Sequence, residues 1–287
     1  LLPGMQGCSS TSTAATVPAK KKLRGTKGLF LKLGTCSRTL FHIVNREFGV
    51  SMELEEKASD PLAGGILQRG HQCGMIWGAS LATSAESYRR FGKNSIASEK
   101  AIRSSQNLVT SFSNQTQCVN CRDIIKCDAS TGFGAFKCFV TGSFFGCFSL
   151  ADNWAGEAVE TANKALQAEG KYCINNERNC ASEVAKMMGA DEKETMMVAG
   201  FAGGLGLSGH ACGALAAAVW LKTLKGMRED PDFELDKVSL LKAFYKESNS
   251  RILCSDICGR HFNSIADHEN HLRGGGCKNL INALAQA

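Results

Sequence analysis

Hydrophobic residues recur along this chain at the spacing of helices, and no long stretch alternates apolar and polar residues as a strand would. Residues 29–48 show the helical spacing in their leucine, isoleucine and phenylalanine positions. Residues 152–168 show it more clearly, and Gly170 is a natural stop for that helix. The pattern therefore predicts an all-α protein.

The later part of the chain repeats a scheme of short helices joined by glycine-rich turns. A glycine-rich turn precedes a predicted helix near 71–91, and Asp191 with Glu194 gives the capping box of another. Residues 196–221 carry no charged side chain, but their six glycines favour a buried turn and a core helix over a membrane span. Further helices are predicted at 95–112, 180–188, 191–202, 210–227, 235–247 and 279–286.

One short segment occurs twice, and each copy contains a cysteine. Residues 63–74 and 202–213 align without a gap, and seven of their twelve positions are identical. The shared positions are Ala-Gly-Gly, Gly-His and Cys-Gly, so Cys73 and Cys212 fall at matching places. Such a match indicates an internal duplication with a period of about 140 residues.

The duplication predicts two tandem, related helical bundles with glycine-rich turns. We expect a flexible tail at 1–28, a first bundle at 29–150 and a second at 151–287, with the helix at 152–168 joining them. Each bundle has four cysteines in one order: one alone, one before glycine, one in Cys-x-Asp-Ile, and one alone. The two predicted quartets are Cys36, Cys73, Cys121 and Cys138, then Cys180, Cys212, Cys254 and Cys277.

The composition is that of a globular protein with many cysteines. Fourteen cysteines in 287 residues leave a choice between ligands of a metal or cluster, redox thiols and structural disulfides. Of the net charge of +6, five positive charges come from basic residues within 20–27, and the rest of the chain is close to neutral. A basic face that binds nucleic acid is therefore not expected.

The first residues resemble the end of a secretory signal. Leu1 to Gly7 are largely apolar, Cys8 would carry the lipid, and a stretch rich in Ser, Thr and Ala up to residue 19 would be a tether. We therefore expect an extracytoplasmic protein held at a membrane through Cys8. A cytoplasmic protein whose true start is Met5 is the alternative.

The repeated segment places its cysteine where a turn becomes a helix. Free N–H groups and the helix dipole there stabilise a thiolate, and a protonated His71 or His210 would add to the effect. Four cysteines in each half equal the ligand count of an iron–sulfur cluster or a zinc ion, and equally that of two disulfides. The accessory candidates are His71, His210, Cys118 and Cys258.

Two other cofactor sites are not supported by the spacing. The C-terminal cysteines and histidines are too closely spaced for a two-Cys two-His zinc finger, so we expect His268 and His271 on a solvated helix. No Cys-x-x-Cys-His occurs in the sequence, so covalently attached haem c is not expected.

Residues 73–78 and 212–217 occupy the place of a known signature. In order and setting, the cysteines resemble those of the C_GCAxxG_C_C family of redox-active proteins, over roughly 29–140 and 174–287. Members typically carry one such module, so this chain resembles a tandem version. The resemblance implies that both quartets are the functional residues. The family is also similar to the non-haem part of split-Soret cytochromes, which implies an iron–sulfur centre without the haem.

Three functions are consistent with these observations. The first is an electron-transfer protein with one iron–sulfur cluster per half, or one shared between the halves, that exchanges electrons with a protein partner. The second is a thiol–disulfide protein in which Cys73 or Cys212 attacks and another quartet member resolves. The third is a metal-stabilised structural or partner-binding module. A homo-oligomer is compatible with each.

Overall fold

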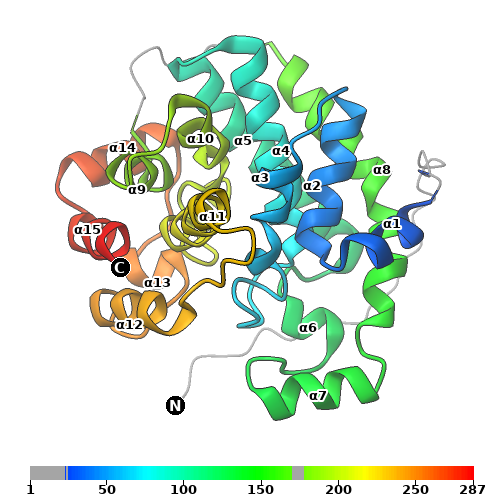
Figure 1. Cartoon of the computed structure of the whole chain (residues 1–287). Helices are drawn as coiled ribbons and strands as arrows, with labels where there is room; N and C mark the ends of the chain where they lie inside the picture. Colours follow the sequence, from blue (N-terminus) through cyan, green and yellow to red (C-terminus); the bar gives the residue numbers. More distant parts are fainter. Residues whose placement is uncertain (1–22, 24, 170–177) are drawn as a thin grey trace.

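The computed structural model describes residue 23 and residues 25–169 and 178–287. These residues form fifteen α-helices and two short 3₁₀-helices, with two isolated β-bridges and no strand among them (Figure 1). The prediction of an all-α protein is confirmed.

The helices form two modules in tandem, and several of them occupy matching places: α2 and α9, α3 and α10, η1 and η2, α4 and α11, and α6 and α13. The first module contains α1 (Thr26–Leu33), α2 (Cys36–Glu47), α3 (Glu53–Lys57), η1 (Asp60–Leu62), α4 (Gly74–Phe91), α5 (Ser95–Thr116), α6 (Cys121–Ile125), α7 (Gly132–Val140) and α8 (Phe145–Gln167). The second contains α9 (Cys180–Met187), α10 (Glu192–Met197), η2 (Ala199–Phe201), α11 (Gly213–Glu229), α12 (Lys237–Glu247), α13 (Cys254–Cys258), α14 (Ile265–Arg273) and α15 (Lys278–Gln286).

Side-chain caps start the matching helices α2 and α9. Thr35 and Asn179 each accept a hydrogen bond from a backbone N–H three residues further on. The capping box predicted for Asp191 and Glu194 is confirmed at the start of α10. In both modules the cap fixes the helix start directly before a cysteine.

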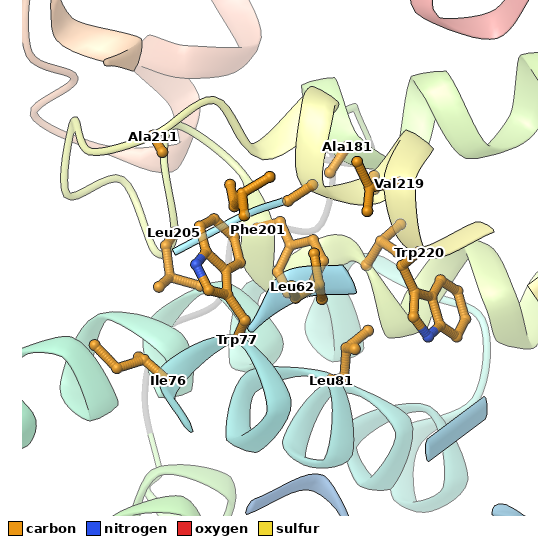
Figure 2. Close-up of a cluster of buried hydrophobic side chains, with 14 of the residues drawn as sticks. Leu62, Ile76, Trp77, Leu81, Ala181, Phe201, Leu205, Ala211, Val219 and Trp220 are labelled. Carbon is orange, nitrogen blue, oxygen red and sulfur yellow. The ribbon is translucent and has the colours of Figure 1, made fainter. Parts of the chain in front are cut away.

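The modules interlock, because the α3–η1 segment packs on α11 and the matching α10–η2 segment packs on α4. The ring of Trp77 on α4 meets Phe201 of η2 edge-on, with ring centroids 4.8 Å apart (Figure 2). The Trp220 indole N–H donates to the carbonyl of Glu55 in α3 (3.1 Å). Both tryptophans, Phe201 and Leu62 are fully buried in one cluster that spans the modules. Aromatic burial of this size dominates core energetics, so the two modules share a single core.

The long α8 belongs by its packing to the first module. It lies against α1, α2 and α5, and its Trp154 ring meets Phe112 edge-on at 4.8 Å. The Lys100 ammonium donates to the carbonyl of Leu166 near the end of the helix (2.8 Å). The helix predicted at 152–168 as a link within the second part thus starts earlier and buries its apolar face in the first module.

No helix among the described residues is both long enough and apolar enough to cross a membrane. The uncharged residues 196–221 instead form part of α10, η2, a glycine-rich loop and the buried first half of α11. The predicted lipid attachment point, Cys8, lies outside the described residues.

Candidate functional site

Four free cysteines of the first module lie at the starts of four helices. Cys36 and Cys121 are the first residues of α2 and α6, Cys73 directly precedes α4, and Cys147 is the third residue of α8. They interact electrostatically, since the other three thiols all act on the pKa of Cys73. We call this set the first centre. The N–H groups and dipoles of its four helices favour negative charge there.

The second module repeats the arrangement. Cys180 and Cys254 are the first residues of α9 and α13, and Cys212 and Cys277 directly precede α11 and α15. The pKa of Cys254 responds to the other three, so the structure brings these four thiols together as well. We call them the second centre.

One residue of the first predicted quartet is corrected by the structure. Cys138 forms a disulfide with Cys127, so it has no free thiol to offer a ligand. Cys147 lies at the centre instead, 26 residues after Cys121, close to the 23 residues between the matching cysteines of the second centre. That spacing was the available signal, because Cys138 follows Cys121 by only 17 residues.

A loop with left-handed backbone runs beside each centre. Residues 64–68 and 203–207 all have positive φ, between 52° and 78°. Such a run is unfavourable for residues other than glycine, yet it recurs at the same place in both modules. The Gly64 N–H bonds to the Cys36 thiol and the Gly203 N–H to Cys180, so each loop supplies a donor to the first cysteine of its centre.

A short backbone pairing fixes the second cysteine of each centre beside the third. The Cys73 N–H donates to the carbonyl of Val119 (2.8 Å), and the Cys121 N–H donates to the carbonyl of His71 (2.6 Å). The same two bonds recur in the second module, at 2.8 and 2.5 Å. The histidine of the repeated segment therefore acts through its backbone carbonyl.

The imidazole rings of these histidines do not carry the positive charge expected from the sequence. Burial lowers the pKa of His71 to about 4, and the charges of Arg122 and Arg69 add to the effect. Burial also lowers the pKa of His210. Both rings are therefore uncharged at pH 7 and do not stabilise a neighbouring thiolate.

Burial keeps most thiols protonated when no cation is bound. It raises the pKa of Cys147 to about 12 and that of Cys212 further. The pKa of Cys36 moves in the opposite direction, because a hydrogen bond with Cys73 lowers it. A metal would remove the remaining protons, since a coordinating thiol is deprotonated outright.

Two further side chains that could bind a metal lie beside the second centre and have no counterpart at the first. The Cys258 Sγ lies 4.0 Å from the Cys254 Sγ and 3.7 Å from the Cys277 Sγ. The His271 Nε2 lies 3.8 Å from the Cys277 Sγ. Cys258 is a predicted accessory candidate. The expectation of a solvated helix is wrong for both histidines: His268 is buried, and His271 is half-buried and turned toward Cys277, where Gly276 leaves room for its ring.

The ligating atoms lie closer together beside the second centre than at the first centre. Within the described residues, Cys258, His271 and Cys277 are the group of three whose ligating atoms all lie within 4.8 Å of one another. No three thiols of the first centre come that close. The accessory candidates His71 and His210 are in no such group, and Cys118 is disulfide-bonded.

A single buried side chain connects the two centres. Gln72, which precedes Cys73, is fully buried, and its Oε1 accepts the backbone N–H of Ala211, which precedes Cys212 (3.0 Å). Its Nε2 donates to the Asn120 Oδ1 (3.3 Å). One hydrogen bond thus joins the side chain that precedes Cys73 to the backbone that precedes Cys212.

A cavity of about 360 Å³ lies over the first centre. Its wall combines three of the thiols with apolar rings, namely Cys36, Cys121, Cys147, Phe30, Phe144 and Phe148. Three of the four cysteines of the first centre therefore line a largely apolar cavity.

Two segments of the chain match one protein family, described as "Putative redox-active protein (C_GCAxxG_C_C)", at residues 35–167 and 177–287. The chain belongs to the C_GCAxxG_C_C family. Each match contains one centre, so one module is one family unit and this chain is a tandem pair of C_GCAxxG_C_C modules, as predicted. No curated protein and no solved structure matches the chain.

Proposed function

We propose that this tandem C_GCAxxG_C_C protein transfers electrons through iron–sulfur clusters held by the first and second centres. The observation that carries the proposal is the meeting of four free thiols at four helix starts, once in each module. Four cysteine thiolates are a common ligand set for such a cluster. The proposed ligands are Cys36, Cys73, Cys121 and Cys147, then Cys180, Cys212, Cys254 and Cys277.

The spread of the thiols favours a cluster over a single ion at the first centre. One tetrahedral ion keeps its ligands within about 4 Å of one another. In a cluster the thiolates bind different iron atoms and lie farther apart. No three first-centre thiols come within 4.8 Å of one another, although all four interact. This spacing leaves room between them for a core of iron and sulfide.

The surroundings suit a negatively charged core. Four helix starts meet at each centre, and the loop amides of Gly64 and Gly203 bond to thiols. Hydrogen bonds to sulfur, burial and nearby dipoles are the features that set the potential of a cluster. The Gln72–Ala211 hydrogen bond provides the route between the two clusters.

An electron-transfer protein needs a partner, and we place its docking surface beside the cavity of the first centre. Large apolar side chains are exposed on α7 and at the start of α8: Phe133, Phe136, Val140 and Phe145. The neighbouring Phe144 and Phe148 line the cavity itself. Such exposed apolar groups are typical of protein contact sites. Lipid attachment at Cys8 would keep this surface at a membrane outside the cytoplasm.

A thiol–disulfide activity is the second candidate, favoured by the Cys36–Cys73 contact. The hydrogen bond with Cys73 lowers the pKa of Cys36, so Cys36 rather than Cys73 would be the attacking thiol. It would displace one thiol from a substrate disulfide and form a mixed disulfide. Cys73 would then release the second thiol and leave a Cys36–Cys73 disulfide, with two electrons passed to the substrate.

The test is visible absorption with iron and sulfide analysis on full-length protein purified without oxygen. We expect a broad visible band that bleaches with dithionite, with iron and sulfide in equal amounts. Cys147→Ser should lose about half of the iron, because only the first centre is broken. The matched control is the double variant Cys127→Ser/Cys138→Ser, which removes the nearby disulfide and should keep both clusters.

A colourless protein without iron or sulfide, even after anaerobic reconstitution, would contradict the cluster proposal. Reduction of a model disulfide that depends on Cys36 would then support the thiol candidate. Equal iron loss in Cys147→Ser and the double variant would remove Cys147 from the ligand set.

A further inference from the structure

Two side chains at the second centre have no counterpart at the first. The matching segments read Cys-Arg-Asp-Ile-Ile at 121–125 and Cys-Ser-Asp-Ile-Cys at 254–258, so Cys258 stands where the first module has Ile125. His271 lies six residues before the last cysteine of its centre, where the first module has Thr141. Both additions are soft or borderline metal ligands. Four thiolates already complete a cluster, so these two ligands need another explanation.

The distances fit one tetrahedral ion. Zinc–sulfur bonds of about 2.3 Å and zinc–nitrogen bonds of about 2.0 Å put tetrahedral ligands about 3.5–3.8 Å apart. The Cys258 and Cys277 sulfurs are 3.7 Å apart, and the His271 Nε2 is 3.8 Å from the Cys277 sulfur. All three ligating atoms lie within 4.8 Å of one another. The ligands are therefore close to the positions that a single ion requires.

The backbone is shaped to bring these three groups together. Cys277 has φ of 60°, a left-handed conformation that is unfavourable for a side chain of its kind. A Cβ at Gly276 would overlap the His271 ring, so glycine is required for the ring to reach Cys277. The Phe262 ring packs against His271 with centroids 5.2 Å apart. These features hold the imidazole and the thiol in place before any ion binds.

We infer that Cys258, His271 and Cys277 bind one mononuclear transition-metal ion of the zinc class, separate from the clusters. All three ligands are half-buried, and three protein ligands leave a fourth position for water or another exchangeable group. Cys277 is also a proposed cluster ligand, so the ion and the second cluster would share its thiolate if both were bound. The ion site rests on its own geometry and does not require the cluster.

The probe is Co²⁺, whose bonds to thiolate and imidazole absorb in the near-ultraviolet and visible. Full-length protein is freed of iron anaerobically and titrated with Co²⁺, and then with Zn²⁺ in competition. Wild-type protein should show the intense visible bands of a tetrahedral ion, and X-ray absorption of the zinc form should show an imidazole. Helix content is recorded by circular dichroism on the same samples, so that unfolding is recognised.

Cys258→Ile, which copies the first module, and His271→Asn should each weaken this binding. The loss should be at least the roughly 10–100-fold that follows removal of a mere outer-shell partner. The control is His261→Asn, since His261 is exposed and in no ligand group of the described residues; it should leave binding unchanged. Where an iron-free variant does not fold, zinc content after growth with added zinc gives the same comparison.

Unchanged Co²⁺ binding in folded His271→Asn, or zinc surrounded by sulfur alone, would overturn the inference, because the ion would then sit on thiols only. Absence of any imidazole-bound ion in a protein that still carries clusters would also overturn it and leave the proposed function standing. An ion bound through His271 in a protein without clusters would support the inference and contradict the proposed function.

Discussion

The first and second centres share one backbone arrangement, which we call the frame, and differ in the side chains around the four thiols, which we call the rim. Each uses four helix starts, a left-handed loop and a short backbone pairing to place four thiols. The first has Ile125 and an apolar cavity of about 360 Å³, with the Cys127–Cys138 disulfide close by. The second has Cys258 and His271 against Cys277. The frame gives both modules a thiol centre, and the rim decides what else each can bind or meet.

The frame itself depends most on the glycines of the left-handed loop. Gly65 has φ of 77°, and a Cβ there would overlap the His71 backbone. Gly65→Ala should lower the free energy of unfolding by about 2–5 kcal/mol, from left-handed strain of about 1–2 and overpacking of about 1–3 kcal/mol. Gly25→Ala is the matched control, since Gly25 also has left-handed backbone but open space around it, and it should cost only about 1–2 kcal/mol.

Equal losses in the two variants, measured by urea unfolding, would show that the close contact of the loop with His71 does not matter. The matching change in the second module, Gly204→Ala, would overlap the His210 backbone and crowd the Cys254 side chain. It should resemble Gly65→Ala if both modules share one frame.

The buried thiols should make the metal-free protein sensitive to alkali. The pKa of Cys147, Cys180 and Cys258 is raised to about 12 from an ordinary value of 9.0. Because the folded pKa is the higher one, the stabilisation is complete below pH 9 and is lost as the pH rises toward 12. The free energy of unfolding should therefore fall over this range in metal-free protein.

Cys258→Ile distinguishes the two centres in that experiment, because it removes one titrating thiol from the second centre alone. The variant should lose less stability between pH 9 and pH 12 than wild-type protein does. An equal fall in both proteins would mean that Cys258 does not titrate as its hydrogen bond with Cys254 and its burial imply. Bound metal should have the opposite dependence, since metal binding displaces protons and strengthens as the pH rises.

Loss of the hydrogen bond between the centres should have a smaller effect on stability than disruption of the frame, but a measurable one. Gln72→Leu leaves the Ala211 N–H without its acceptor in a buried place, which costs about 1–3 kcal/mol. The same variant should slow electron exchange between the centres, followed by the reduction kinetics of each cluster. Gln106→Leu, at an exposed position of α5, is the control and should change stability by less than about 0.5 kcal/mol. Identical exchange rates would exclude the Gln72 route.

The smallest effect on stability is expected when Ile125 of the first module is replaced by cysteine, the residue at the matching position 258 of the second module. Ile125→Cys exchanges one buried apolar side chain for a smaller one and should cost about 1–2 kcal/mol or less. It should not create an ion site, because the first module has no histidine in the place of His271. A Co²⁺ site with the same affinity as the second would show that the thiols suffice without the imidazole.

The sequence alone predicted the duplication, the helical class and seven of the eight cysteines that meet in the two centres. It could do so because glycine and cysteine keep recognisable spacing in both copies, and because caps such as Asp191 with Glu194 act locally. The sequence placed Cys138 in the first quartet because spacing does not show which cysteines form disulfides, and the fold pairs Cys138 with Cys127.

Only the tertiary structure showed that His71 and His210 are uncharged, that Cys147 is the fourth cysteine of the first centre, and that His271 lies beside Cys277. A pKa depends on burial and on neighbours such as Arg122, which come from distant parts of the chain. The ring of His271 reaches Cys277 only because Gly276 and the left-handed backbone at Cys277 bring them together. Local spacing fixes which residues start helices, but only packing in three dimensions decides which of those starts converge.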